Sequence, residues 1–223
     1  MESSHARDAL AELALRPAVV TIDLHRGHLD PEVATLPLPA DASAALVERV
    51  VPLLDNLRAV GVPVIHVVTS YRNRAEILGN AYWRFQAGRP DSARAAIAEH
   101  NLEWLPGLEL MPGVGREGDA IVNTKKRYDC LLGTDLEMIL AAGAHDSLLV
   151  MGVNTNSCVL ATAVAASVRD LAVFVVEEGV DTMLGSDLHD AALSVIDASF
   201  GWVVRAETAL AVLRERTERP VTA

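Results

Sequence analysis

The chain has 223 residues, of which 51% are hydrophobic and only 4% aromatic, and its formal net charge at pH 7 is −11. An acidic chain without clustered lysine and arginine excludes nucleic acids and anionic membrane surfaces as expected partners, since both need a basic contact surface. No apolar run reaches the length of a membrane span, and the N-terminal residues lack the basic and apolar regions of a signal peptide. We therefore expect a cytoplasmic protein. The two cysteines are too few for a disulfide framework, and in a reducing compartment we expect both to be thiols.

Short apolar runs alternate with longer helical patterns along the chain, which is typical of an α/β fold. We predict strands over residues 18–23, 62–70, 119–124, 147–153, 171–178 and 201–205. Helices are predicted over residues 41–61, 133–144, 157–170, 186–200 and 206–216. This alternation implies a doubly wound, six-stranded, mainly parallel sheet with helices on both faces. We expect one domain over residues 1–223, with its core over about 17–205.

The residues that follow each strand are the candidates for a site, because ligands of doubly wound sheets bind beyond the carboxyl ends of the strands. Asp23 ends the first strand, where burial would raise its pKa and make it a usable proton acceptor; a structural hydrogen-bond role explains it equally well. Lys125 and Lys126 follow the third strand, where one lysine could supply positive charge to a nucleophile and the other would be an ordinary surface residue.

Cys158 lies where the fourth strand meets its helix, in the stretch MGVNTNSCVLATA. A helix N-terminus stabilises a thiolate, so Cys158 is a candidate nucleophile with a lowered pKa, although a free cysteine is also commonly a small buried side chain. Cys130 is interpreted as a packing residue. A thiolate that attacks a carbonyl, a carboxylate that carries protons and a lysine that balances charge would together form a hydrolase site.

Three stretches of the chain resemble the isochorismatase-like cysteine hydrolase family, namely VVTIDLHRGHLD, IVNTKKRYDCLLGTDLEMIL and LLVMGVNTNSCVLATAVAASVRDLAVFVVEEGVDT. The family includes nicotinamidases, N-carbamoylsarcosine amidases, and ureidoacrylate and biuret hydrolases. The resemblance covers roughly residues 17 to 205. It implies a Rossmann-like three-layer sandwich and a homodimer or homotetramer.

The resemblance also implies roles for individual residues. Asp23 takes the position of the proton shuttle, Lys125 that of the lysine and Cys158 that of the nucleophile. A cis peptide bond between Val153 and Asn154 is implied as well. It would turn the Asn154 N–H toward the Cys158 N–H, so that the two form an oxyanion hole.

The chain departs from the family pattern at two places near the expected pocket. His25 stands where the family often has glutamine, and Asp129-Cys130-Leu131 replaces Ser-Ala-Phe. These differences would change which substrate is bound, and not the type of reaction. The retained Cys158 favours C–N cleavage, since family members that cleave an enol ether do not rely on a cysteine.

We therefore expect a cysteine-dependent amidohydrolase. It would cleave a small linear amide or N-carbamoyl (ureido) compound through a thioester and release ammonia or an amine. The alternatives are an isochorismatase-type enol-ether hydrolase and a non-catalytic protein that binds small molecules on the same scaffold.

The residues expected to contact the substrate come from several loops. Arg72 could anchor a substrate carboxylate or simply face solvent, and Trp83 could line the pocket or fill a core. A cluster of Asp23, His25 and His28 would suit zinc, but nicotinamidases bind their metal after the second strand, where this chain has no histidine. We therefore expect neither a metal nor another cofactor. The full set of expected substrate contacts is His25, His28, Arg72, Trp83, Tyr128 and Asp129.

Overall fold

The computed structural model describes residues 2–218, which form a six-stranded sheet covered by helices. The strands run in the spatial order β3-β2-β1-β4-β5-β6, and every neighbouring pair is parallel. Because successive strands are added outward from β1 on one side and from β4 on the other, the sheet is doubly wound, as predicted. The strands are β1 (Pro17–Ile22), β2 (Val64–Thr69), β3 (Ala120–Lys125), β4 (Ser147–Val153), β5 (Ala172–Asp181) and β6 (Trp202–Val204).

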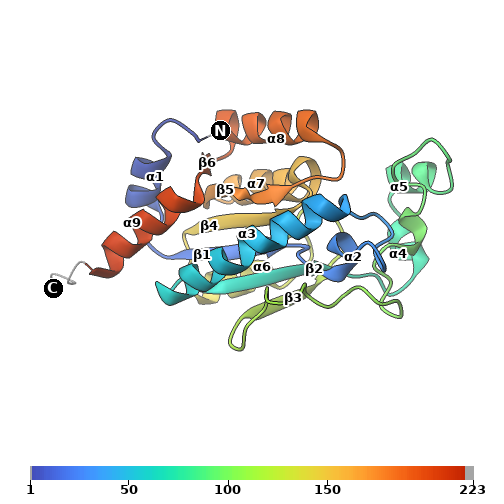
Figure 1. Cartoon of the computed structure of the whole chain (residues 1–223), viewed down its shortest axis with the longest axis horizontal. Coiled ribbons are helices and arrows are strands. Elements are labelled where there is room, and N and C mark those ends of the chain that lie inside the picture. Colours follow the sequence, from blue (N-terminus) through green and yellow to red (C-terminus); the bar gives the residue numbers. More distant parts are fainter. Residues whose placement is uncertain (1, 219–223) are drawn as a thin grey trace.

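Helices cover both faces of the sheet (Figure 1). On one face, side chains of α1 (Ala6–Leu13), α3 (Ala40–Ala59) and α9 (Ala206–Glu218) pack with one alternating set of strand residues. On the other face, α6 (Leu136–Ala142), α7 (Leu160–Ser167) and α8 (Ser186–Ser199) pack with the opposite set. Two-sided burial explains why β1 and β4 are mostly apolar. No helix in the part of the chain that the structure describes is both long and apolar enough to cross a membrane.

A separate cap lies beyond the carboxyl ends of the strands. It contains α4 (Arg74–Leu78), α5 (Ala81–Gln86) and a 3₁₀ turn, η1 (Ile97–Glu99). Its small core is formed by Leu36, Tyr71, Ile77, Trp83, Ile97 and Leu102. Figure 1 shows α4 and α5 standing apart from the main helical layers. The sequence pattern did not predict these short elements, nor α1 and α2 (Arg26–Leu29).

The strand register brings the ends of β1, β2, β3 and β4 to the same edge. Ile22 pairs with both Val67 and Gly152. Gly152 has a φ of 122°, and a Cβ there would lie 2.0 Å from the Ile22 carbonyl oxygen. Only glycine allows β4 to approach β1 this closely, two residues before Asn154.

The helix predicted over residues 157–170 begins differently from the expectation. A π-helical turn, η2 (Thr155–Val159), precedes α7. Cys158 therefore lies inside this π-helical turn and not in the first turn of an α-helix. Such turns interrupt regular helices and are frequent at functional sites.

Candidate active site

Asp23 follows β1 directly and is fully buried. Its φ of 56° turns the chain out of the strand, a left-handed conformation that aspartate tolerates better than most residues. The Oδ1 atom accepts a hydrogen bond from the Thr69 backbone N–H at 2.8 Å, and Oδ2 accepts one from the Lys125 ammonium at 2.6 Å. The carboxylate is thus held between the ends of β2 and β3.

Lys125 ends β3, opposite Thr69 of β2 in the sheet register. Its buried ammonium donates to Asp23 Oδ2, to Thr69 Oγ1 at 2.5 Å and to Cys158 Sγ at 3.2 Å. These three contacts match the three protons of an ammonium group. Lys126 instead donates to the Ser70 carbonyl oxygen. The structure therefore places Lys125, and not its neighbour, between the carboxylate and the thiol.

The π-helical turn presents Cys158 from the other side of the site. The Asn154 carbonyl oxygen accepts hydrogen bonds from the Ser157 and Val159 N–H groups. The peptide bond between Val153 and Asn154 is cis. The Asn154 side-chain oxygen accepts a bond from the Met183 N–H at 2.8 Å, which ties this turn to the segment after β5.

The three buried groups have strongly shifted pKa values. Burial raises the pKa of the Cys158 thiol to about 11, and the nearby Lys125 charge offsets this only in part. Burial alone would also raise the pKa of Asp23, but the charge of Lys125, with smaller effects of His25 and His28, holds it well below the ordinary value. Both expectations from sequence, a lowered pKa for the cysteine and a raised one for the aspartate, are therefore wrong. At rest the site holds a thiol, a carboxylate and an ammonium group.

A cavity opens above Cys158 and contains about 430 Å³ of non-protein space, including its mouth. Three of the expected substrate contacts, His28, Trp83 and Tyr128, line it. Arg94 and His100 were not expected from the sequence, because they come from the cap region, which has no strand–helix alternation to locate it. The complete lining is His28, Leu36, Thr69, Tyr71, Trp83, Arg94, Ile97, His100, Lys125, Arg127, Tyr128, Asn154, Ser157, Cys158 and Met183.

The other expected substrate contacts do not line this cavity. His25 is completely buried, and its Nδ1 lies 2.7 Å from the Gly107 carbonyl oxygen. The Arg72 side chain is 72% exposed and pairs with Glu76. Asp129 accepts a hydrogen bond from the Leu131 N–H. Each of these three side chains therefore has a structural partner outside the cavity.

Asp23, His25 and His28 lie close enough to be considered as metal ligands, since one donor atom from each lies within 4.8 Å of the others. His25 Nε2 lies 3.5 Å from Asp23 Oδ1, and neither this nitrogen nor the buried His28 Nδ1 has a hydrogen-bond partner among the described residues. Burial lowers the pKa of His28 to about 3, so its ring is neutral, as a metal ligand must be. However, both Asp23 oxygens already accept hydrogen bonds. A cation would have to compete with the Lys125 ammonium for this carboxylate.

Comparisons with known proteins identify the family. The family model described as the isochorismatase domain matches residues 17–208. The chain belongs to the isochorismatase family. It is a hydrolase with the α/β fold of that family.

Individual relatives are distant in sequence. Maleamate amidohydrolase of Pseudomonas putida is 28% identical over 199 residues, which cover 89% of this chain and 87% of that protein. N-carbamoylsarcosine amidase of an Arthrobacter species is 27% identical over 145 residues, 65% of this chain and 51% of that protein. The structure of a cysteine hydrolase from Pseudomonas syringae matches with a TM-score of 0.77 at 22% identity, covering 91% of this chain and 97% of that one. This last match supports the fold.

Proposed function

We propose that this isochorismatase-family hydrolase is a cysteine-dependent amidohydrolase that cleaves the C–N bond of a small amide or N-carbamoyl compound. The observation that carries the proposal is the contact of one buried ammonium, that of Lys125, with both the Asp23 carboxylate and the Cys158 sulfur beside a cavity. Relatives named maleamate amidohydrolase and N-carbamoylsarcosine amidase support amide hydrolysis.

In the first half of the reaction, Cys158 Sγ attacks the amide carbonyl carbon while Asp23 takes the thiol proton. The carbonyl π-electron pair moves to oxygen, and the Asn154 and Cys158 N–H groups hold this oxyanion. Because burial raises the pKa of the resting thiol to about 11, we propose that Asp23 takes the proton as the sulfur attacks. The C–N bond then breaks, and Asp23 returns its proton to the departing nitrogen, leaving an acyl thioester.

In the second half, water attacks the thioester. Asp23 removes a proton from the water as its oxygen bonds to the acyl carbon, and the C–S bond breaks with the electron pair passing to sulfur. The sulfur regains the proton, and a carboxylic acid leaves. Throughout both halves, the Lys125 charge stabilises the negative charge that moves between Asp23 and Cys158. We therefore propose Asp23 as a proton carrier and not as a metal ligand.

We also expect a particular compartment and oligomeric state for the whole protein. The cysteines of the described chain are both free thiols, which supports a reducing compartment such as the cytoplasm. A homodimer or homotetramer stays a prediction, to be checked by light scattering.

The test is product analysis on a panel of primary amides, ureido acids and vinyl ethers, using protein treated with a chelator. We expect ammonia or an amine, together with the matching acid, from one class of amides or ureido acids, at a rate that the chelator leaves unchanged. Cleavage of a vinyl ether without ammonia would instead indicate an enol-ether hydrolase. Binding of panel compounds without any product would indicate a non-catalytic binding protein.

A further inference from the structure

The cavity is positively charged although the chain as a whole is acidic. Arg94, Lys125 and Arg127 line it, and none of its lining residues is acidic. Asp23 compensates Lys125, whereas neither arginine pairs with a carboxylate among the described residues. The formal net charge of the protein is −11, so this local excess of positive charge has the opposite sign. A cavity of this kind attracts and retains an anion.

The Tyr128 hydroxyl group can donate one further hydrogen bond. Its oxygen accepts a hydrogen bond from Trp83 Nε1 at 2.9 Å and another from Arg94 Nε at 3.1 Å. A phenol oxygen has two lone pairs and one proton, so these bonds use both lone pairs and leave the proton. No acceptor for that proton is found among residues 2–218. The Tyr128 O–H is therefore available to a ligand.

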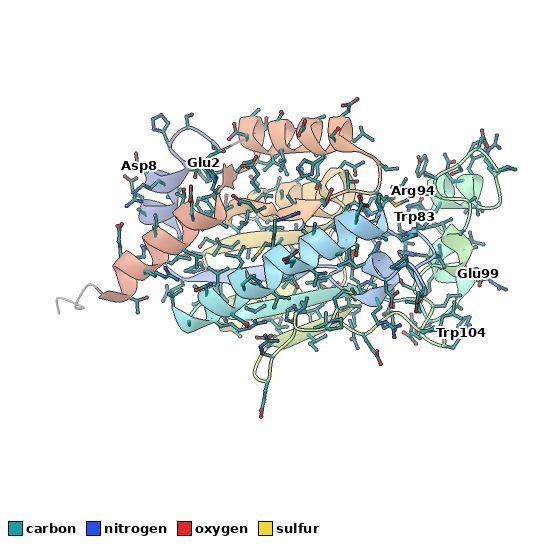
Figure 2. The ribbon with its side chains drawn as sticks, in the orientation of Figure 1. Glu2, Asp8, Trp83, Arg94, Glu99 and Trp104 are labelled. Carbon is teal, nitrogen blue, oxygen red and sulfur yellow. The ribbon has the colours of Figure 1, made fainter. Side chains whose placement is uncertain are left out.

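Arg94 supplies further donors at the same place. Its Nε is used by Tyr128, while its terminal nitrogens make no hydrogen bond within the described chain. Arg94 and Trp83, labelled in Figure 2 near the cap, both donate to the Tyr128 hydroxyl oxygen. A guanidinium fork next to a phenol O–H is the donor arrangement that suits a carboxylate.

Arg127 has a different role from Arg94 in the cavity. Its Nη1 donates to the backbone carbonyls of Glu76 and Lys126, and its guanidinium lies over the Trp83 ring, 5.2 Å from the centroid. These contacts fix Arg127 as part of the wall. Its charge adds to the local potential, and both protons of its Nη1 are directed at backbone carbonyls.

We infer that the substrate is a small amide with a free carboxylate, and that Arg94 and Tyr128 bind this carboxylate while the amide carbonyl lies at Cys158. The inference rests on the proposed function, which supplies the amide. The space above Cys158 is small, since the volume of about 430 Å³ includes its open mouth. It suits the monoamide of a short dicarboxylic acid or an N-carbamoyl amino acid.

The test uses protection of Cys158 from alkylation by the neutral reagent iodoacetamide, measured on the Cys158 peptide by mass spectrometry. Succinate and maleate should protect the thiol at saturating concentration, and the uncharged succinamide should protect it much less. Arg94→Gln should raise the concentration of succinate needed for protection at least about tenfold, and Tyr128→Phe several-fold. Arg94→Lys should restore part of the loss. Arg72→Gln is the matched control, because Arg72 is exposed and paired with Glu76, and it should behave as the wild type.

The same variants are then compared on succinamate and succinamide as substrates. Arg94→Gln should lower kcat/KM for succinamate while leaving that for succinamide within about threefold. Equal protection of wild type and Arg94→Gln, absence of protection by either dicarboxylate, or equal protection by succinate and succinamide would each overturn the inference. Protection that depends on Arg94, together with no turnover of any amide, would refute the proposed function and leave the carboxylate site standing.

Discussion

At the scale of single residues, the ion pair between Asp23 and Lys125 offsets the effect of burial on both charged groups. Both groups are buried, and their charged atoms lie 2.6 Å apart. Burial alone would lower the pKa of Lys125, but Asp23 holds it well above its ordinary value. Each charge is therefore stable in the interior only because the other is present.

We predict that Asp23→Asn and Lys125→Met each lower kcat by at least about a thousandfold, because the residues act as a coupled set. Each variant should also lose about 3–5 kcal/mol of unfolding free energy, since the remaining charge is buried without its partner. Lys126→Met is the matched control and should keep its rate within about twofold. Steady-state kinetics and urea denaturation test this. Wild-type turnover by Asp23→Asn would refute the proton-carrier role.

A second prediction concerns the ionisation of Cys158. With a pKa of about 11, the thiolate fraction at neutral pH is small and rises about tenfold for each pH unit up to that value. The rate of Cys158 alkylation in the free protein should follow this rise from pH 7 to 10. Lys125→Met should slow alkylation at a given pH, because the nearby positive charge favours the thiolate. A rate that reaches its plateau below pH 8 would contradict the resting thiol.

Individual residues explain which features of the site could be predicted from the sequence. Asp23, Lys125 and Cys158 follow strands, so the topology alone brings them to one edge. Their pKa shifts depend on burial and on distances between side chains, which no local pattern encodes. Arg94 and His100 come from the cap, where the contact with the cavity is purely tertiary.

At the scale of elements, Gly152 sets the spacing between β1 and β4 next to the site. We predict that Gly152→Ala destabilises the protein by about 2–5 kcal/mol, because it combines backbone strain with a steric clash against Ile22. Gly61→Ala is the control. Gly61 also has a positive φ, 81°, but no atom lies within 4 Å of the position that a Cβ would take there, so this substitution should cost about 1 kcal/mol. Urea denaturation of both variants tests this, and equal losses would mean that close packing at Gly152 has no effect.

The lengths and burial of the elements explain why the sheet and its helices were easier to predict than the cap. The strands are apolar because helices bury both their faces, and the long helices α3, α8 and α9 carry a clear periodicity. The cap elements α4 and α5 have only 5 and 6 residues, too few to show a period. Their capping residues Asn73 and Asn80 are local signals that could have located them.

At the scale of the whole molecule, buried neutral histidines make stability depend on pH. Burial lowers the pKa of His28 to about 3 and that of His100 well below its ordinary value. In the unfolded chain both rings take up protons near pH 6.5. Below that pH the unfolded state therefore binds more protons than the folded state, and stability falls as the pH falls.

We predict that the unfolding free energy decreases between pH 7 and pH 5, by up to about 1.4 kcal/mol per pH unit for each of these histidines. His100→Gln should remove one contribution and give a shallower dependence than the wild type. Urea denaturation at several pH values measures both. Identical slopes for the two proteins would show that His100 is not held neutral by the fold.

The central claim is that the hydrolase reaction passes through Cys158, and the most direct measurement is turnover by Cys158→Ala on the substrate found in the panel. Cys130→Ala is the matched control, because Cys130 is also buried and free but does not line the cavity. The account predicts no detectable turnover by Cys158→Ala, with an unchanged circular dichroism spectrum, and nearly wild-type kcat for Cys130→Ala. Wild-type turnover by Cys158→Ala would contradict it.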